Sequence, residues 1–146
     1  MIIRELEFED YYRGFLDVIN LFTKGYDPAG ASYVMQYNAF VSLYGRMLGQ
    51  GCKVLVAVED EKVVGTAKIL LEMKFHNRCA LMGHIEDVAV LPEHRHKKIG
   101  KRLVQECMRF ARDCYKVVLS CKEELCGFYG MNGFVKTGTA MTFYRS

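Results

Sequence analysis

The stretch PEHRHKKIGKRL, residues 92–103, decides the fold that we expect, because of its charge and its neighbours. It carries five Lys and Arg residues and two histidines, with no acid after Glu93. The apolar run ALMGHIEDVAVL (80–91) precedes it, and a helical pattern over 99–114 and a second apolar run, KVVLSC (116–121), follow. Strand, loop, helix and strand in this order predict a right-handed crossover between two parallel strands. The apolar residues on one side of that helix are Ile99, Leu103, Val104, Cys107, Met108 and Ala111.

The rest of the chain extends this unit into one mixed sheet. Two β-rich runs, 53–59 and 63–75, flank a short turn and predict a hairpin. Earlier, residues 2–7 favour a strand, and helical patterns cover 8–22 and about 31–48, with a break at 24–28. Later, 122–133 favours a short helix and 134–145 a final strand. We expect a single α/β domain over 1–146, with a mixed sheet and helices on both faces.

Composition excludes several classes of protein. A length of 146 residues suits one domain, and a net charge of +3 is too small to indicate nucleic-acid binding by itself. No apolar stretch approaches the roughly 20 residues that span a bilayer. Acids occupy the first residues, where a signal peptide would be basic and then apolar. We therefore expect a soluble cytoplasmic protein without membrane or nucleic-acid partners, although the sequence does not exclude an organelle.

The six cysteines form no Cys-x-x-Cys pair, and most lie in apolar segments. This pattern favours reduced thiols that act as small hydrophobic residues over a structural metal site. We expect no metal.

The basic loop at 92–103 predicts an anion site. A helix N-terminus presents unpaired N–H groups and a partial positive charge, and the preceding strand ends just before it. Gly100 lets a backbone approach closely. Cations at a helix start oppose the helix dipole, so a bound pyrophosphate would explain them. The alternative is a solvated basic turn.

Glu86 and Asp87 are adjacent acids in an apolar strand. Alternation along a strand places them on opposite faces. Acids in such a strand are costly unless they are hydrogen-bonded, which favours a site role for at least one over a structural ion pair.

Three segments resemble the Gcn5-related N-acetyltransferase (GNAT) family: IEDVAVLPEHR (85–95), RHKKIGKRLV (95–104), and CYKVVLSC (114–121) followed by GFYGMNGF (127–134). The family loop reads Q/R-x-x-G-x-G/A; Arg95 and Gly100 match its ends, and Lys98 replaces the inner glycine. Together with EMKF (72–75), these segments are most similar to the eukaryotic glucosamine 6-phosphate N-acetyltransferases. Two further departures are Tyr144, which aligns with a terminal arginine of these enzymes, and Leu125, which replaces an asparagine before Gly-Phe-Tyr.

The resemblance implies the GNAT fold and acetyl-CoA as the acetyl donor. It implies that the pantetheine arm binds along Val88, Ala89 and Val90, and that Tyr129 assists departure of the CoA thiolate. The residues that it places around the pyrophosphate are Arg95, His96, Lys97, Lys98, Ile99, Gly100 and Lys101. The alternative for Tyr129 is a core tyrosine.

For the acceptor, the resemblance implies transfer to the 2-amino group of D-glucosamine 6-phosphate, a step toward UDP-N-acetylglucosamine. Glu86 would contact the sugar and accept a proton through water. The other substrate candidates are Lys74, His76, Asp87, Tyr115, Lys116 and Arg145, although each basic residue alone is equally consistent with a solvated surface charge. A homodimer with shared active sites is also implied.

Three alternatives remain open. The same fold may act on another amine, such as a polyamine, a small metabolite or a protein N-terminus. A CoA-binding regulator without catalysis is suggested by Lys98 and the altered KEELCG stretch (122–127). A basic nucleic-acid module is disfavoured, because the loop lacks aromatic residues.

Overall fold

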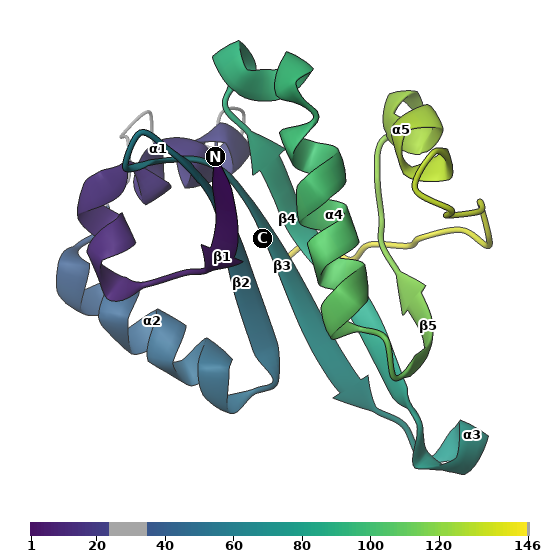
Figure 1. Cartoon of the computed structure of the whole chain (residues 1–146). Coiled ribbons are helices and arrows are strands. Elements are labelled where there is room, and N and C mark those ends of the chain that lie inside the picture. The colour runs from purple at the N-terminus through teal and green to yellow at the C-terminus, as the bar shows by residue number, and fades with distance from the viewer. Residues whose placement is uncertain (24–34, 146) are drawn as a thin grey trace.

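The computed structural model describes residues 1–23 and 35–145, which form a five-stranded sheet with helices on both faces (Figure 1). Strands β1 (Ile2–Glu5), β2 (Cys52–Glu59), β3 (Lys62–Met73) and β4 (Leu81–Val90) pair antiparallel in chain order. The chain then forms α4 (Ile99–Phe110) and returns as β5 (Cys114–Val118), which pairs with β4 in parallel. The expected mixed sheet and its parallel crossover are confirmed.

Side-chain alternation along β2 separates the core into two layers. Leu55 and Ala57 pack toward α4, whereas Val54 and Val56 pack toward α1 (Phe15–Thr23) and α2 (Tyr37–Gly49). The predicted apolar stripe of α4 is confirmed except at Met108, which is 38 % exposed; the wholly buried members are Ile99, Leu103, Val104 and Cys107. Helices therefore cover both faces because the strand is apolar on both.

The helical pattern at 8–22 becomes two helices. A 3-10 helix, η1 (Phe8–Arg13), ends at Gly14, whose φ of 92° is left-handed, and α1 follows. The wholly buried carboxylate of Asp10 accepts two hydrogen bonds from Arg4, at 2.7 and 2.8 Å. The second predicted helix is α2, which begins at Tyr37. The predicted break at 24–28 and the predicted helix start near 31 lie outside the described residues.

Three boundaries differ from the sequence expectation. The helix predicted to end at 114 stops at Phe110, and β5 begins at Cys114 rather than at residue 116. The short helix predicted over 122–133 is a 3-10 turn, η3 (Glu123–Leu125), followed by α5 (Cys126–Gly130). A turn that includes α3 (His76–Cys79) joins β3 to β4, and a second 3-10 turn, η2 (Pro92–Lys97), joins β4 to α4.

The final strand predicted at 134–145 is wrong for the described chain, where these residues form no strand. Strand patterns need a neighbour to pair with, and the segment pairs with no strand among the residues that the structure describes. Its large apolar side chains are instead exposed, at 94 % for Met141 and 82 % for Phe143.

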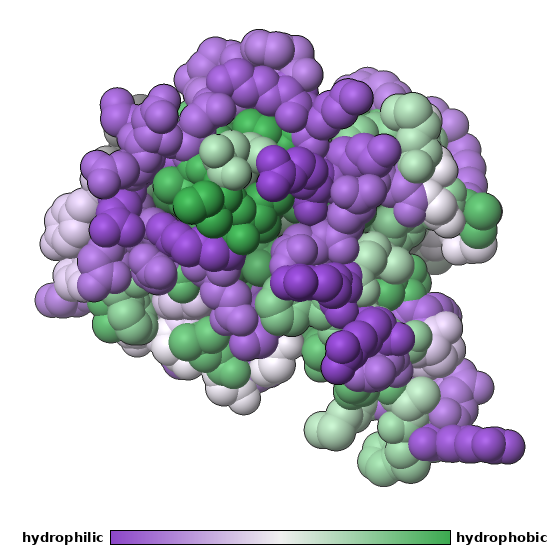
Figure 2. Space-filling model, viewed as in Figure 1, coloured by the Kyte–Doolittle hydropathy of each residue, from purple (hydrophilic) through white to green (hydrophobic). Residues whose placement is uncertain are grey.

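The surface of the molecule is mixed. Figure 2 shows hydrophilic residues over much of the face in view, with hydrophobic ones gathered around β1 and the N-terminus. The β3–β4 hairpin and α3 project beyond the rest of the molecule (Figure 1). Within residues 1–23 and 35–145, no helix has the length and apolar character needed to cross a bilayer.

Candidate active site

A cavity opens where β4 and β5 part. The parallel pairing covers only the first half of β4, from Leu81 to His84. Beyond it, residues 85–90 and residues 119–122 line opposite sides of a cavity of about 600 Å³. The second half of β4 therefore lacks a strand neighbour on this side, so its backbone groups face the cavity.

A β-bulge places both acids at this cavity. The β3–β4 register shifts between the pairs Thr66–Ala89 and Lys68–Glu86, and Asp87 has a left-handed φ of 53°. The bulge interrupts strand alternation: Ile85 and Val88 both pack in the core layer of α4, so the two acids between them lie on the other face, and the prediction that Glu86 and Asp87 point to opposite faces is wrong. Both residues line the cavity. Asp87 Oδ2 also lies 2.7 Å from Lys68 Nζ.

Sequence reasoning missed Lys68. The available signal was a single lysine inside the apolar run of residues 67–71. Its side chain is 22 % exposed and pairs with Asp87, which is 45 % exposed. The sequence left two roles open for the acids, a place at the site or a structural ion pair. Asp87 has both features, since it lines the cavity and pairs with Lys68.

The basic loop ends at the N-terminus of α4. Lys98, at the position of the family's inner glycine, has a φ of 58°, in the region that glycine favours. The prediction that this loop precedes a helix at Ile99 is confirmed. The side chains of His96, Lys98 and Lys101 are exposed.

Several of the loop's basic groups already have partners within the chain. Lys97 Nζ and His94 Nδ1 lie 2.6 and 2.9 Å from Glu59 Oε2, and Arg95 Nε donates to the Val90 carbonyl at 3.1 Å. The hydrogen bond from Lys97 holds the pKa of Glu59 below its usual value, and the charges of Lys97 and His94 add to this effect. These contacts anchor the loop to β4 and to the end of β2.

Helix α5 packs against the start of α4 and places Tyr129 at the cavity. A Cβ atom at Gly100 would lie 3.4 Å from the Phe128 ring, so glycine here gives close contact between the two helices. Tyr129 lines the cavity and is 8 % exposed. Burial raises the pKa of its phenol, and the charges of Cys121 and Cys107 raise it further. Tyr129 therefore keeps its proton at neutral pH and can donate it.

Three of the basic substrate candidates, Lys74, His76 and Lys116, lie at the far end of the sheet. Lys74 Nζ is 2.5 Å from Glu72 Oε1, and His84 Nε2 is 2.6 Å from Glu72 Oε2. The His76 ring meets the Tyr115 ring edge-on at 5.9 Å, and Lys116 Nζ lies 5.5 Å from the centre of that ring. The Arg145 guanidinium lies 5.5 Å from the Phe143 ring.

One chain does not bring these candidates together with Glu86. Lys68 pairs with Glu86 across the sheet, and Lys74 lies six residues farther along β3, which corresponds to about 20 Å. A single sugar phosphate is shorter than this distance. The predicted substrate residues therefore form two separate groups in one chain, one at the cavity and one at the hairpin end.

The cysteines only partly match their expected role. All six are free thiols, and Cys52 and Cys107 are buried, whereas Cys79 and Cys121 are exposed. In the part of the chain that the structure describes, no cluster of three or more His, Cys, Asp or Glu side chains has the geometry of a metal site.

Comparison with known proteins agrees with this architecture. The acetyltransferase (GNAT) family matches residues 7–134. Glucosamine 6-phosphate N-acetyltransferase 1 of Oryza sativa subsp. japonica is 34 % identical, over 97 % of this chain and 86 % of that protein. The Arabidopsis thaliana glucosamine 6-phosphate N-acetyltransferase is 31 % identical, over 97 % and 95 %. The crystal structure of glucosamine-6-phosphate N-acetyltransferase from Arabidopsis thaliana superposes with a TM-score of 0.89 at 29 % identity, covering 99 % of this chain and 98 % of that one. With its split sheet and its helix-capped loop, the chain belongs to the GNAT family of acetyltransferases.

Proposed function

We propose that this acetyltransferase moves the acetyl group of acetyl-CoA to the 2-amino group of glucosamine 6-phosphate, giving N-acetylglucosamine 6-phosphate and CoA. The observation that carries the proposal is the cavity between β4 and β5, which has acids on one strand and the Tyr129 phenol nearby. The names of the relatives supply the acceptor.

The donor would bind as an additional strand. Backbone groups of residues 88–90 lack a β5 partner, so they can pair with the amide groups of a pantetheine arm. The arm then leads to the N-terminus of α4, where the amides of residues 96–101 meet the pyrophosphate. Glu59 holds Lys97 at 2.6 Å, so the amides rather than that side chain carry most of this recognition.

Transfer is a direct attack of the neutral amine on the thioester carbonyl. A C–N bond forms as the C–S bond breaks, and the backbone N–H of Val88 stabilises the oxyanion. Glu86 accepts the proton of the amine through water, because it lines the cavity as an exposed carboxylate. Tyr129 gives a hydrogen bond or a proton to the departing thiolate, in keeping with its raised pKa.

The complete acceptor site would require a second copy of the chain. The group at the hairpin end (Lys74, His76, Tyr115 and Lys116) lies about 13 to 20 Å from Glu86 along the sheet, which is farther than one sugar phosphate spans. Next to this group, Met73 is 83 % exposed and Phe75 fully exposed, and the C-terminal segment exposes further apolar residues. In the proposed homodimer these surfaces are covered, and the lysines of one copy bind the phosphate of a sugar held by the other.

Free-thiol release from acetyl-CoA tests the proposal. Release is measured with glucosamine 6-phosphate and, as the matched control, with unphosphorylated glucosamine. We expect fast release only with the phosphate ester, because the basic groups bind a dianion. Equal rates with both sugars would show that the enzyme does not recognise the phosphate group of the acceptor. Absence of release with either sugar, while CoA still binds, would overturn the acceptor assignment.

A further inference from the structure

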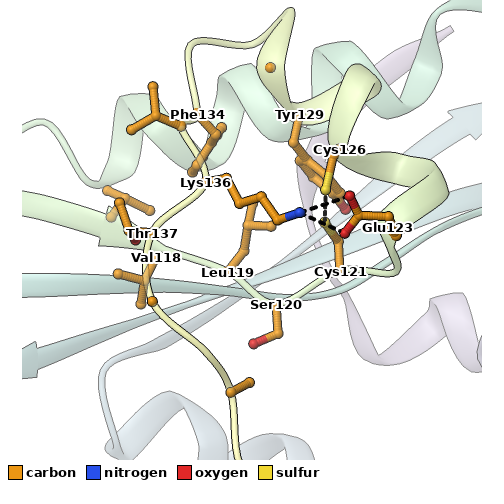
Figure 3. A pocket seen from close by; sticks show the side chains of 15 residues that line it. Val118, Leu119, Ser120, Cys121, Glu123, Cys126, Tyr129, Phe134, Lys136 and Thr137 are labelled. Atoms are coloured by element: carbon orange, nitrogen blue, oxygen red, sulfur yellow. Dashed lines mark hydrogen bonds and ion pairs between the residues drawn. The ribbon is translucent and has the colours of Figure 1, made fainter.

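Two thiols lie side by side next to Tyr129. Cys121 Sγ and Cys126 Sγ are 3.9 Å apart, one on each side of the short turn η3 (Figure 3). A disulfide bond is about 2.05 Å long, so small side-chain rotations would bring the sulfurs together. Four residues lie between the two cysteines in sequence, so closure involves only one local loop.

The pair is open to reagents from two sides. Both thiols line a second cavity of about 270 Å³, closed in part by the C-terminal segment. Cys121 also lines the larger cavity between β4 and β5, where it is near Tyr129. Cys121 is exposed and Cys126 half-buried, which makes Cys121 the first point of attack.

The charges around the pair largely cancel. Lys136 Nζ lies 2.7 and 2.8 Å from the two carboxylate oxygens of Glu123, beside the thiols (Figure 3). Desolvation and the hydrogen bond with Cys126 raise the pKa of Cys121, with Glu123 raising it slightly and Lys136 opposing. The raised pKa keeps the Cys121 thiol protonated at neutral pH, and its exchange reactions speed up as the pH rises.

We propose that Cys121 and Cys126 form a dithiol site that reduces small-molecule disulfides and closes to an intramolecular disulfide. The Cys121 thiolate attacks one sulfur of the small disulfide; that S–S bond breaks, and the first thiolate leaves and takes up a proton. The Cys126 thiolate then attacks the Cys121 sulfur and displaces the second thiol, which is also protonated. Two protein thiols lose two electrons, and the small disulfide gains them as two thiols.

Closure would also stop acetyl transfer, a consequence that rests on the proposed function. The new bond draws Cys121 toward α5, which carries Tyr129, at the wall of the donor cavity. Displacing a group at a reaction centre by about 1 Å can reduce the rate by about 10²-fold. The linked form should therefore lose at least about tenfold in turnover and recover it with dithiothreitol.

Peptide mapping tests the bond without any acetyl transfer. The purified protein is treated with glutathione disulfide, alkylated and digested with trypsin without reduction. Lys122 lies between the two cysteines, so cleavage after it separates VVLSCK (117–122) from EELCGFYGMNGFVK (123–136). We expect these two peptides to stay joined and to separate after reduction.

Two variants sharpen the outcome. Cys126→Ser should stop at the mixed disulfide, so that Cys121 carries one glutathione. The matched control Cys79→Ser removes another exposed thiol and should leave the joined peptides in place. Reaction of Cys79 shows that the reagent was active. The proposal is overturned if Cys79 has reacted but the two peptides of the parent protein are separate, with each of their cysteines either alkylated or carrying one glutathione. It is also overturned if Cys121 joins a different cysteine.

Discussion

The carboxylate of Asp87 meets the ammonium group of Lys68 at 2.7 Å across the bulge of β4. The left-handed backbone of Asp87 is costly for a residue with a side chain, and it persists only where its surroundings hold it. The ion pair is one such restraint, and it fixes a carboxylate at the rim of the cavity beside Glu86.

Replacing Lys68 should therefore disturb the acceptor site. We expect Lys68→Met to raise the KM for the amino sugar by about tenfold, because Asp87 loses the cation that orients it. Steady-state kinetics with varied sugar and varied acetyl-CoA measure the effect. Lys53→Met is the matched control, since Lys53 pairs with Glu5 at 3.1 Å and lies on the opposite face of the sheet, over Phe110 of α4. If only the KM for acetyl-CoA changes, Lys68 does not act on the acceptor.

Tyr129→Phe should reduce turnover more than it weakens donor binding. The variant removes one oxygen and keeps the ring that packs against Phe128 and Phe134. We expect kcat to fall by about 10²-fold, with the Kd of acetyl-CoA within about threefold of the parent value. Stopped-flow transfer rates and calorimetric binding measure the two quantities. Equal turnover in both proteins would remove Tyr129 from the mechanism.

Lys98→Gly separates the loop backbone from its side chain. Glycine adopts the φ of 58° without strain, so the folded state should gain up to about 1 kcal/mol, offset in part by the greater freedom of the unfolded chain. The amide remains, and we expect the Kd of CoA to stay within about threefold. A loss of more than about tenfold would show that the Lys98 ammonium group itself binds the donor.

A mixture of two variants, assayed at a sugar concentration far below the KM, at which each alone has little activity, tests the shared site. Glu86→Gln and Lys116→Ala lie in the two separate groups of candidates. If each site takes one group from each copy, co-expressed heterodimers contain one intact site, and random pairing restores about a quarter of the parent activity. Sites confined to one chain would leave the mixture as inactive as its components. Lys116→Ala alone should mainly raise the KM for the sugar phosphate.

The Arg4–Asp10 pair predicts a pH dependence of stability. Burial raises the pKa of Asp10, but hydrogen bonds from Arg4 and the Glu7 backbone, together with the charge of Arg4, outweigh burial and lower it below its usual 3.8. Because the pKa of Asp10 is lower in the folded state, its ionised carboxylate stabilises the fold at pH values above the unfolded-state pKa. This stabilisation is lost as the pH falls through the folded-state pKa. Asp10→Asn should cost about 3 kcal/mol at neutral pH. Urea unfolding should show this difference shrinking below pH 3.8; a constant difference would contradict the charge argument.

The sequence predicts most of this fold because its strands and helices have distinct periods. The apolar stripe of α4 and the apolar residues of β2 to β4 predict which side chains are buried in the core. Helix ends are harder to predict. The helix predicted over 8–22 is divided at Gly14, whose backbone is left-handed, and a hydrophobic pattern does not reveal such a residue.

The site was harder to predict, for two physical reasons. A bulge changes which face a side chain occupies, and nothing in the run IEDVAV (85–90) signals the left-handed Asp87. Motifs such as EMKF (72–75) and CYKVVL (114–119) also do not show how far their residues lie from Glu86 in space. Only the strand registers show that Lys74 lies about 20 Å from Glu86 along the sheet and that Lys116, opposite Met82, lies about 13 Å from it. The final strand failed because an apolar pattern does not show whether a neighbouring strand is available, and residues 134–145 pair with none of the described strands.

The gap beside the second half of β4 also bears on how long the protein survives in a cell. A sheet that stops short exposes backbone groups that pair with water until a ligand binds. A ligand that fills the gap stabilises the folded state by mass action, by about 2.7 kcal/mol at a hundred times its Kd. Such a gain reduces the fraction open to proteases about a hundredfold. The supply of the donor metabolite would then set the abundance of the enzyme as well as its rate.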